Sequence, residues 1–246
     1  MKQASVLKIN LQGAYNYRTM KTNLNKYKLF GDLLCYPTGN TLEMVGECIN
    51  QSGREEAIEN LKQFESFVRE NSRHRLEEIY TRTFHIQAIC YLDLGYVLFG
   101  EDYKRGEFLV NMKREQELAG NDCGDELADN LSNVLTLLPK IKDVDFLNEL
   151  VARVLLPALE KMLKEFESSR IQFKAEMLRK KHKALIQQDE KYLNIYQHLL
   201  RALQKNLQGD FEDIKLPALE YSSERISEDK FLESCGGCQT TKKQKV

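Results

Sequence analysis

Several features that mark common protein classes are missing from this sequence. It has no tryptophan, only 4 prolines and 13 glycines among 246 residues. It also lacks any apolar run near the roughly 20 residues that cross a bilayer. Few helix breakers, together with many Leu, Lys and Glu, favour helix over sheet. The 36 basic and 37 acidic residues nearly cancel, which argues against the net basic surface of a general nucleic-acid binder. The composition therefore predicts a soluble, all-α protein.

Recognisable catalytic and cofactor motifs are also absent. The sequence contains no glycine-rich phosphate loop, no G-x-S-x-G and no H-E-x-x-H. Its four histidines lack the i,i+4 spacing of a ligand pair, and the Glu-x-x-His pairs of a di-iron bundle are missing. We therefore expect a protein that acts by binding, without enzymatic activity and without a bound cofactor.

Six cysteines are present, and no secretory signal peptide precedes them. We expect reduced thiols in the cytosol, not a disulfide framework. Cys235 and Cys238 form a C-x-x-C, which can be half of a zinc site or a redox pair. Zinc needs four ligands, and a thioredoxin-like role needs a βαβ context that is missing. Two interpretations stay open: transient metal or thiol chemistry, and a flexible tail that binds no metal.

Charge and apolar content divide the chain into three parts. Residues 1–31 contain six basic residues and no acid, whereas residues 209–234 contain eight acids and three basic residues. We predict a flexible basic arm over 1–20, one compact multi-helix domain over 21–208 and an acidic, flexible tail over 209–246. Two smaller domains are the alternative for this length. An organelle transit peptide fits the first segment poorly, because it is rich in Tyr and Asn and has one Arg.

Apolar residues recur at helical spacing through the central region. The pattern predicts a helix capped by Thr41 and helices over 21–36, 54–70, 72–84, 86–99, 105–119, 126–138, 146–166 and 170–207. Residues 86–99 are apolar on nearly all sides, so we expect a central, buried helix there. Pro157 lies inside one helical pattern and predicts a kink or break just before it. Gly120 is expected to end the helix 105–119 in a left-handed conformation.

Four short strings occur in the order, and at the intervals, of a known family. They are LLCYP at 33–37, EIYTRTF at 78–84, GEDYKRG at 100–106 and ELADNL at 126–131. Through them the chain resembles the respiratory nitrate reductase delta-subunit type of molybdenum-cofactor assembly chaperones. The resemblance covers residues 24–166 and, more weakly, 192–207, and residues 168–191 look like an insertion.

The resemblance implies a single all-helical chaperone domain without enzymatic activity. Such a chaperone binds the N-terminal segment of the apo catalytic subunit of a molybdopterin oxidoreductase in the cytoplasm. It holds that subunit open until the molybdenum cofactor and an iron–sulfur cluster are installed, and then leaves. The expected partner is therefore a catalytic subunit of the nitrate reductase type, with no nucleic acid and no membrane insertion.

Three aromatic residues are candidates for a groove that takes an amphipathic client helix. Tyr80, Phe84 and Tyr91 have spacings of 4 and 7, which place them on one side of a helix if that helix continues past His85. The alternative interpretation is ordinary packing of these rings in the core. The spacing alone favours the core, and the resemblance raises the weight of the groove.

A second set of candidates is polar. Arg105 could pair a client carboxylate, and Glu126 and Asp129 could meet client Lys or Arg side chains. Leu127, in the same string, is predicted to contact the client with them. The alternative for the acids is a structural role near a helix N-terminus, where negative charge is favourable without a partner.

Two other functions remain open. One is a metal or thiol-redox carrier that uses Cys235 and Cys238, with the helical domain as its docking platform. The other is a helical scaffold subunit that stays in its mature complex.

Overall fold

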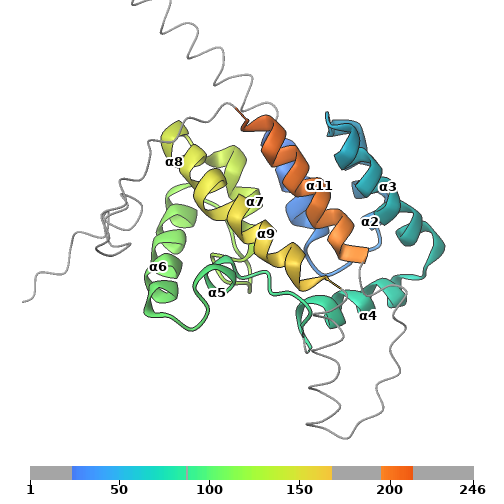
Figure 1. Cartoon of the computed structure of the whole chain (residues 1–246), viewed down its shortest axis with the longest axis horizontal. Coiled ribbons are helices and arrows are strands. Elements are labelled where there is room, and N and C mark those ends of the chain that lie inside the picture. Colours follow the sequence, from blue (N-terminus) through green and yellow to red (C-terminus); the bar gives the residue numbers. More distant parts are fainter. Residues whose placement is uncertain (1–23, 87, 168–194, 213–246) are drawn as a thin grey trace, which may run out of the picture.

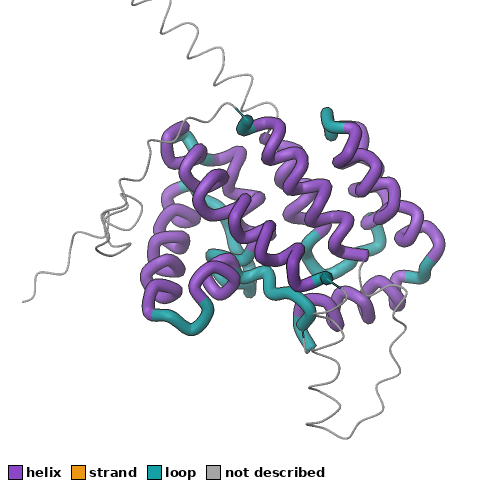
Figure 2. Tube along the Cα trace, in the orientation of Figure 1, coloured by secondary structure: helices purple, strands orange, loops and turns teal. Residues whose placement is uncertain are grey.

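The computed structural model describes residues 24–86, 88–167 and 195–212. Helices joined by loops make up these ranges, and no β-strand occurs in them (Figure 2). The prediction of an all-α fold is thereby confirmed. The predicted arm over 1–20, the insertion over 168–191, and Cys235 and Cys238 lie outside the described residues.

Figure 1 labels the helices in chain order, coloured from blue to red along the sequence. After a first helix over residues 24–33, they are α2 (Thr41–Gln51), α3 (Glu55–Glu70), α4 (Arg73–Phe84), α5 (Leu94–Phe99), α6 (Tyr103–Leu118), α7 (Leu131–Leu137), α8 (Val144–Glu149), α9 (Leu156–Glu165) and α11 (Ile195–Asp210). A 3₁₀ turn, Leu138–Lys140, follows α7, and a π-helical turn, Leu150–Leu155, joins α8 to α9.

Helix α11 comes last among the described elements but packs near the middle of the molecule. It lies between α3 on one side and α9 on the other, while α5 packs against both α6 and α9 (Figure 1). Its buried residues include Leu199, Leu203 and Leu207, at the i, i+4, i+8 spacing of one helical face. The core is therefore continuous from the earliest described helix to the latest.

Hydrogen bonds fix α11 to the first helix. The Lys26 ammonium lies 2.7 Å from the Asp210 carboxylate and donates to Asn206 Oδ1 at 3.4 Å. Tyr27 donates its hydroxyl to Asp210 at 2.8 Å, and Asn206 donates to Ser52 Oγ at 3.1 Å. The predicted domain boundary at residue 208 falls inside this structure, because α11 continues to Asp210 and the next side chain, Phe211, is buried.

Helix ends follow the local sequence closely. Ser72 caps α4 by accepting the N–H of Arg75, and Gly120 adopts a left-handed φ of 59° after α6. The predicted break before Pro157 appears as the π-helical turn Leu150–Leu155. Asn40, not Thr41, occupies the N-cap position of α2.

The expected buried helix over residues 86–99 is wrong. Helix α4 ends at Phe84, Ile86 is 67% exposed, and only Leu94–Phe99 forms a helix. The residues before α5 are extended: the Leu94 N–H donates to the Asp129 carbonyl, and the Leu131 N–H donates to the Leu92 carbonyl, at 3.0 and 2.9 Å. An antiparallel backbone pair takes the place of a helical turn.

The expected helix over residues 126–138 is wrong at its start for the same reason. Helix α7 begins at Leu131, and Asn130 caps it by accepting the N–H of Ser132 at 3.1 Å. Residues 126–130 form a turn whose backbone pairs with the segment before α5. None of the helices in 24–86, 88–167 and 195–212 combines the length and apolar composition that a bilayer crossing requires.

Candidate functional site

Among the described residues, a single isolated bridge between Asp93 and Asn130 joins the segment before α5 to the string at 126–131. Around it gather Asp93, Arg105, Glu126, Asp129 and Asn130, which we call the polar corner. They come from four local elements: Asp93 ends an extended segment, Arg105 lies in the first turn of α6, Glu126 and Asp129 share a turn, and Asn130 caps α7. The backbone pairing thus sets the positions of charged groups that are far apart in the sequence.

Arg105 lies at the centre of the charged groups. Its guanidinium is 4.0 Å from Asp93 Oδ2 and lies over the Tyr96 ring, 5.1 Å from the ring centroid. The Tyr96 ring packs edge-on against Tyr91, with centroids 4.6 Å apart. Burial raises the pKa of Asp93, and the Arg105 charge lowers it in part. Arg105 therefore contacts groups of its own chain, and 30% of its side chain stays exposed.

Asp129 is buried, contrary to the expectation of an exposed client-binding acid. Its Oδ2 accepts the N–H of Gly95 at 2.9 Å, while Oδ1 has no hydrogen-bond partner in the described residues. Burial is the main reason that the pKa of this carboxyl is raised, with the Asp93 charge adding to it. A side chain on Gly95 would come within 2.7 Å of Oδ2. Asp129 thus joins α5 to the turn before α7.

Glu126 is the exposed acid of the polar corner. It accepts from the Asn130 amide at 3.3 Å, and the same amide donates weakly to Asp93 at 3.5 Å. Burial is the main cause that raises the pKa values of Asp93 and of the Cys35 thiol. The charge of Glu126 raises both further. Glu126 therefore gives the surface near Asp93 and Cys35 a negative potential.

Exposed apolar side chains occur next to these residues in the chain: Leu127 follows Glu126, Tyr36 follows Cys35, and Tyr91 lies two residues before Asp93. Tyr36, Tyr91 and Leu127 are 53%, 43% and 42% exposed, respectively. Tyr36 stacks edge-on over Tyr80, at 5.6 Å between ring centroids. We call Tyr36, Tyr91, Glu126 and Leu127 the candidate surface, because they combine accessible apolar area with an accessible carboxylate.

Tyr80 and Phe84 are core residues, 4% and 5% exposed. Their rings pack against each other and against Tyr196 of α11, with centroids 4.9 to 5.8 Å apart. The Tyr80 hydroxyl donates to the Leu34 carbonyl at 3.0 Å. Because α4 ends at Phe84, Tyr91 does not share a helix face with them, so the three residues do not line one groove as expected from their spacing.

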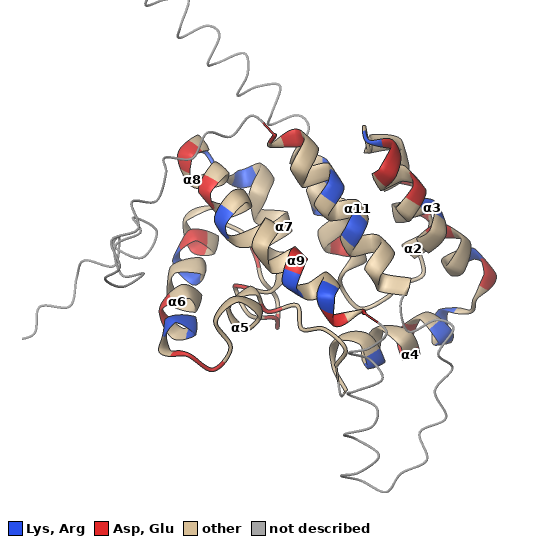
Figure 3. Cartoon of the chain, in the orientation of Figure 1, with Lys and Arg blue, Asp and Glu red and all other residues tan. Residues whose placement is uncertain are grey.

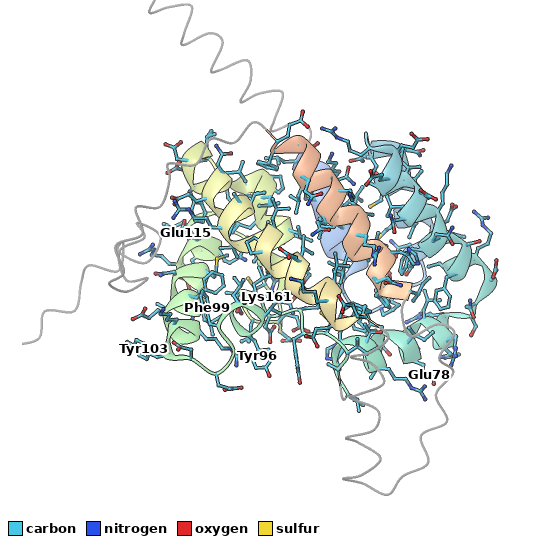
Figure 4. The ribbon with its side chains drawn as sticks, in the orientation of Figure 1. Glu78, Tyr96, Phe99, Tyr103, Glu115 and Lys161 are labelled. Carbon is cyan, nitrogen blue, oxygen red and sulfur yellow. The ribbon has the colours of Figure 1, made fainter. Side chains whose placement is uncertain are left out.

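A cavity of about 630 Å³ opens beside Tyr91, between the segment before α5 and the end of α9. Ala88, Ile89, Val97 and Met162 line it with apolar surface, and charged side chains from the end of α9 complete the lining: Lys161, Lys164 and Glu165. Lys161 borders it and donates to the Leu98 carbonyl at 2.9 Å, next to Tyr96 and Phe99 in Figure 4. Its volume lies within the range of about 300–1,000 Å³ that is usual for ligand pockets, so it has room for more than one side chain of a partner.

Sequence reasoning did not select Asp93, Tyr96, Asn130 or Tyr36 as site residues. A signal existed for Asp93, since it is the only charged residue in the apolar run from 86 to 99. The other three became recognisable only through contacts with residues distant in the sequence. Within the described residues, no cluster of three or more Asp, Glu, His or Cys is placed to hold a metal ion.

Comparison with known proteins does not assign a family: no protein-family model matches this chain, and no curated protein matches it. The resemblance to the assembly chaperones therefore depends on the four strings themselves. What the structure adds is the place of each string in space and the accessibility of its side chains.

Proposed function

We propose that this protein is an assembly chaperone for a nitrate reductase-type molybdenum oxidoreductase. It binds the N-terminal segment of the apo catalytic subunit through the candidate surface and keeps that subunit competent for cofactor insertion. The observation that carries the proposal is the exposed carboxylate of Glu126 among the exposed apolar side chains of Tyr36, Tyr91 and Leu127. Such a surface fits an amphipathic segment with both apolar and basic side chains.

The arrangement of the four resembling strings supports the proposal. Tyr36 of the first string stacks on Tyr80 of the second. Cys35, also in the first string, lies within the field of Glu126 in the fourth. Arg105 of the third string acts electrostatically on Asp129 of the fourth. The strings therefore meet around one part of the molecule, as residues of a shared binding surface would.

The cavity beside Tyr91 gives the bound segment an anchoring point. The apolar part of its lining would take apolar side chains of the client, while Glu126 meets a client Lys or Arg. A chaperone has to release its client, so we expect a dissociation constant of about 1 µM, equivalent to about −8 kcal/mol.

The deciding experiment combines capture with a charge reversal. The tagged protein is used to capture partners from its native cell extract, and mass spectrometry should find the catalytic subunit of a molybdopterin oxidoreductase. Calorimetry with that subunit's N-terminal peptide should show about tenfold weaker binding for Glu126→Lys, equivalent to about 1.4 kcal/mol. Asp129 is unsuitable for this test, because it is buried and its substitution would also change stability.

Glu59→Lys is the matched control. Glu59 is an exposed acid on α3, at the opposite end of the molecule from α6 (Figure 1). The Glu59→Lys variant should bind the peptide as tightly as the unmodified protein does. No capture of a molybdopterin subunit, or equal loss of binding in both variants, would contradict the proposed role of the candidate surface.

A further inference from the structure

Helix α6 presents an apolar stripe that nothing in the described residues covers. Tyr103, Val110 and Leu118 are 81%, 64% and 75% exposed. They are three of the four most exposed large apolar side chains in the described part of the chain. In Figure 4, Tyr103 projects from the outer edge of α6. Val110 lies seven residues after Tyr103 and Leu118 a further eight, so the three fall along one side of the helix. Exposed apolar side chains aligned along one side of a helix are typical of association sites.

Tyr103 and Val110 of the stripe occupy positions of a helix-pairing seam, and Leu118 lies one position beyond that seam. Tyr103, Gly106, Val110 and Lys113 follow one another at intervals of 3, 4 and 3, the spacing of a and d positions in a heptad. Gly106 has an ordinary helical conformation, and a Cβ there would meet nothing within 4 Å. The bare backbone at this position lets another helix approach closely.

Two charged residues of opposite sign lie on either side of Val110, so the stripe of one copy is complementary in charge to the same stripe of a second copy. Glu107 lies three residues before Val110, and Lys113 lies three residues after it. Neither forms an ion pair with another residue in the described ranges. Figure 3 shows acidic and basic residues interspersed along α6. When two such helices cross antiparallel at Val110, each Glu107 faces Lys113 of the other copy, and two symmetric pairs of opposite charge form.

We propose that the outer face of α6 binds the same face of a second copy of this chain. The two helices run antiparallel about a twofold axis at Val110, and Gly106 of each receives the longer side chains of the other. A self-complementary face of this kind closes into a dimer and does not continue into a filament.

The contact is small, so the dimer is weak. A helix of 16 residues is about 24 Å long, and one pair of such helices buries less than the roughly 1,600 Å² of a standard interface. We expect a dissociation constant of about 10 µM. The dimer leaves the polar corner accessible, because Arg105 points from the inner side of α6 toward Asp93.

Sedimentation equilibrium of the full chain tests the proposal, over concentrations from about one tenth to about ten times the expected constant. The unmodified protein should change from monomer to dimer across this range. Val110→Asp places two carboxylates on the axis and should leave a monomer throughout. Ile86→Asp is the control, since Ile86 is 67% exposed and lies outside α6. Circular dichroism checks that both variants keep their helices.

Charge exchange tests the antiparallel arrangement itself. Glu107→Lys or Lys113→Glu alone creates two like-charge pairs and should weaken the dimer about tenfold. The double variant Glu107→Lys with Lys113→Glu restores both pairs and should return the constant to within about threefold of its original value. The proposal is overturned by a monomer at every concentration, by a dimer insensitive to Val110→Asp, or by a double variant as weak as the single ones.

Discussion

Asp129 is a buried carboxylate with only part of its hydrogen-bonding capacity used. Oδ2 accepts the Gly95 N–H, whereas Oδ1 has no partner in the described residues. Burial raises the pKa of this carboxyl. At a pH between its unfolded-state and folded-state pKa values, the folded protein therefore holds a proton that the unfolded chain has released. Stability contributed by the group is therefore full below the unfolded-state pKa and declines as pH rises toward the folded-state pKa. At neutral pH the buried charge of Asp129 therefore destabilises the folded state.

Asp129→Asn should therefore stabilise the protein at neutral pH. The amide oxygen keeps the bond to Gly95 and the buried charge disappears, so we expect a gain of about 1 kcal/mol at pH 7. The gain should shrink as pH falls toward the pKa of an ordinary aspartate, because the wild-type carboxyl becomes neutral there. Urea unfolding at both pH values measures it.

Asp125→Asn, at an exposed position in the same turn, is the control and should leave the free energy of unfolding unchanged at both pH values. A loss of stability for Asp129→Asn at pH 7 would show that the carboxylate, with Arg105 nearby, stabilises the fold in its charged form.

At the level of single elements, two glycines on neighbouring helices should respond oppositely to the same substitution. A Cβ at Gly95 of α5 would lie 2.7 Å from Asp129 Oδ2 and 3.1 Å from the Phe108 ring, whereas one at Gly106 of α6 meets open space. We expect Gly95→Ala to destabilise by about 2 kcal/mol through overpacking. Gly106→Ala should stabilise by about 1 kcal/mol, because alanine loses less backbone entropy in a helix.

Chemical unfolding of both variants, with the helix content checked by circular dichroism, measures the two effects. Stabilisation by Gly95→Ala would mean that α5 can move away from the turn before α7. A loss of stability in Gly106→Ala would mean that the outer face of α6 is covered within a single chain.

Helices with a one-sided apolar pattern were predictable from sequence, and segments paired through their backbones were not. The range 54–70 matches α3 (Glu55–Glu70) to within a residue, because its apolar stripe and its bounds are local properties. Residues 86–99 are apolar on nearly all sides, and an apolar run fits a buried extended segment as well as a helix. The bonds that decide the matter join Leu94 to Asp129, which lie 35 residues apart.

The candidate site was predictable only where its residues are exposed. Glu126 and Leu127 were selected from a polar string, and both are accessible in the structure. Asp129 was selected from the same string but is buried, because its neighbour Asn130 bridges to Asp93 and turns it inward. Periodicity assigned Tyr80 and Phe84 to one helix face correctly, but it does not distinguish a groove from the core.

At the scale of the whole molecule, one buried ion pair joins the two ends of the described chain. Lys26 and Asp210 lie 2.7 Å apart with side chains 7% and 20% exposed. Tyr27 also donates to Asp210. Burial, with the charge of Asp210 and this hydrogen bond adding to it, raises the pKa of the Tyr27 hydroxyl well above its usual value. These contacts keep α11 against the first helix, and α11 in turn covers the aromatic rings of Tyr80 and Phe84.

Asp210→Ala should destabilise the protein by about 3 kcal/mol, because it leaves the ammonium of Lys26 buried without its counter-ion. The nearby pair Arg54–Glu212 is the control: its side chains are 45% and 62% exposed, and Glu212→Ala should cost less than about 1 kcal/mol. Adding Lys26→Met to Asp210→Ala removes the stranded charge and should recover part of the loss, which a double-mutant cycle measures as coupling. Equal, small losses in Asp210→Ala and Glu212→Ala would mean that water reaches Lys26, and that apolar packing alone holds α11 in place.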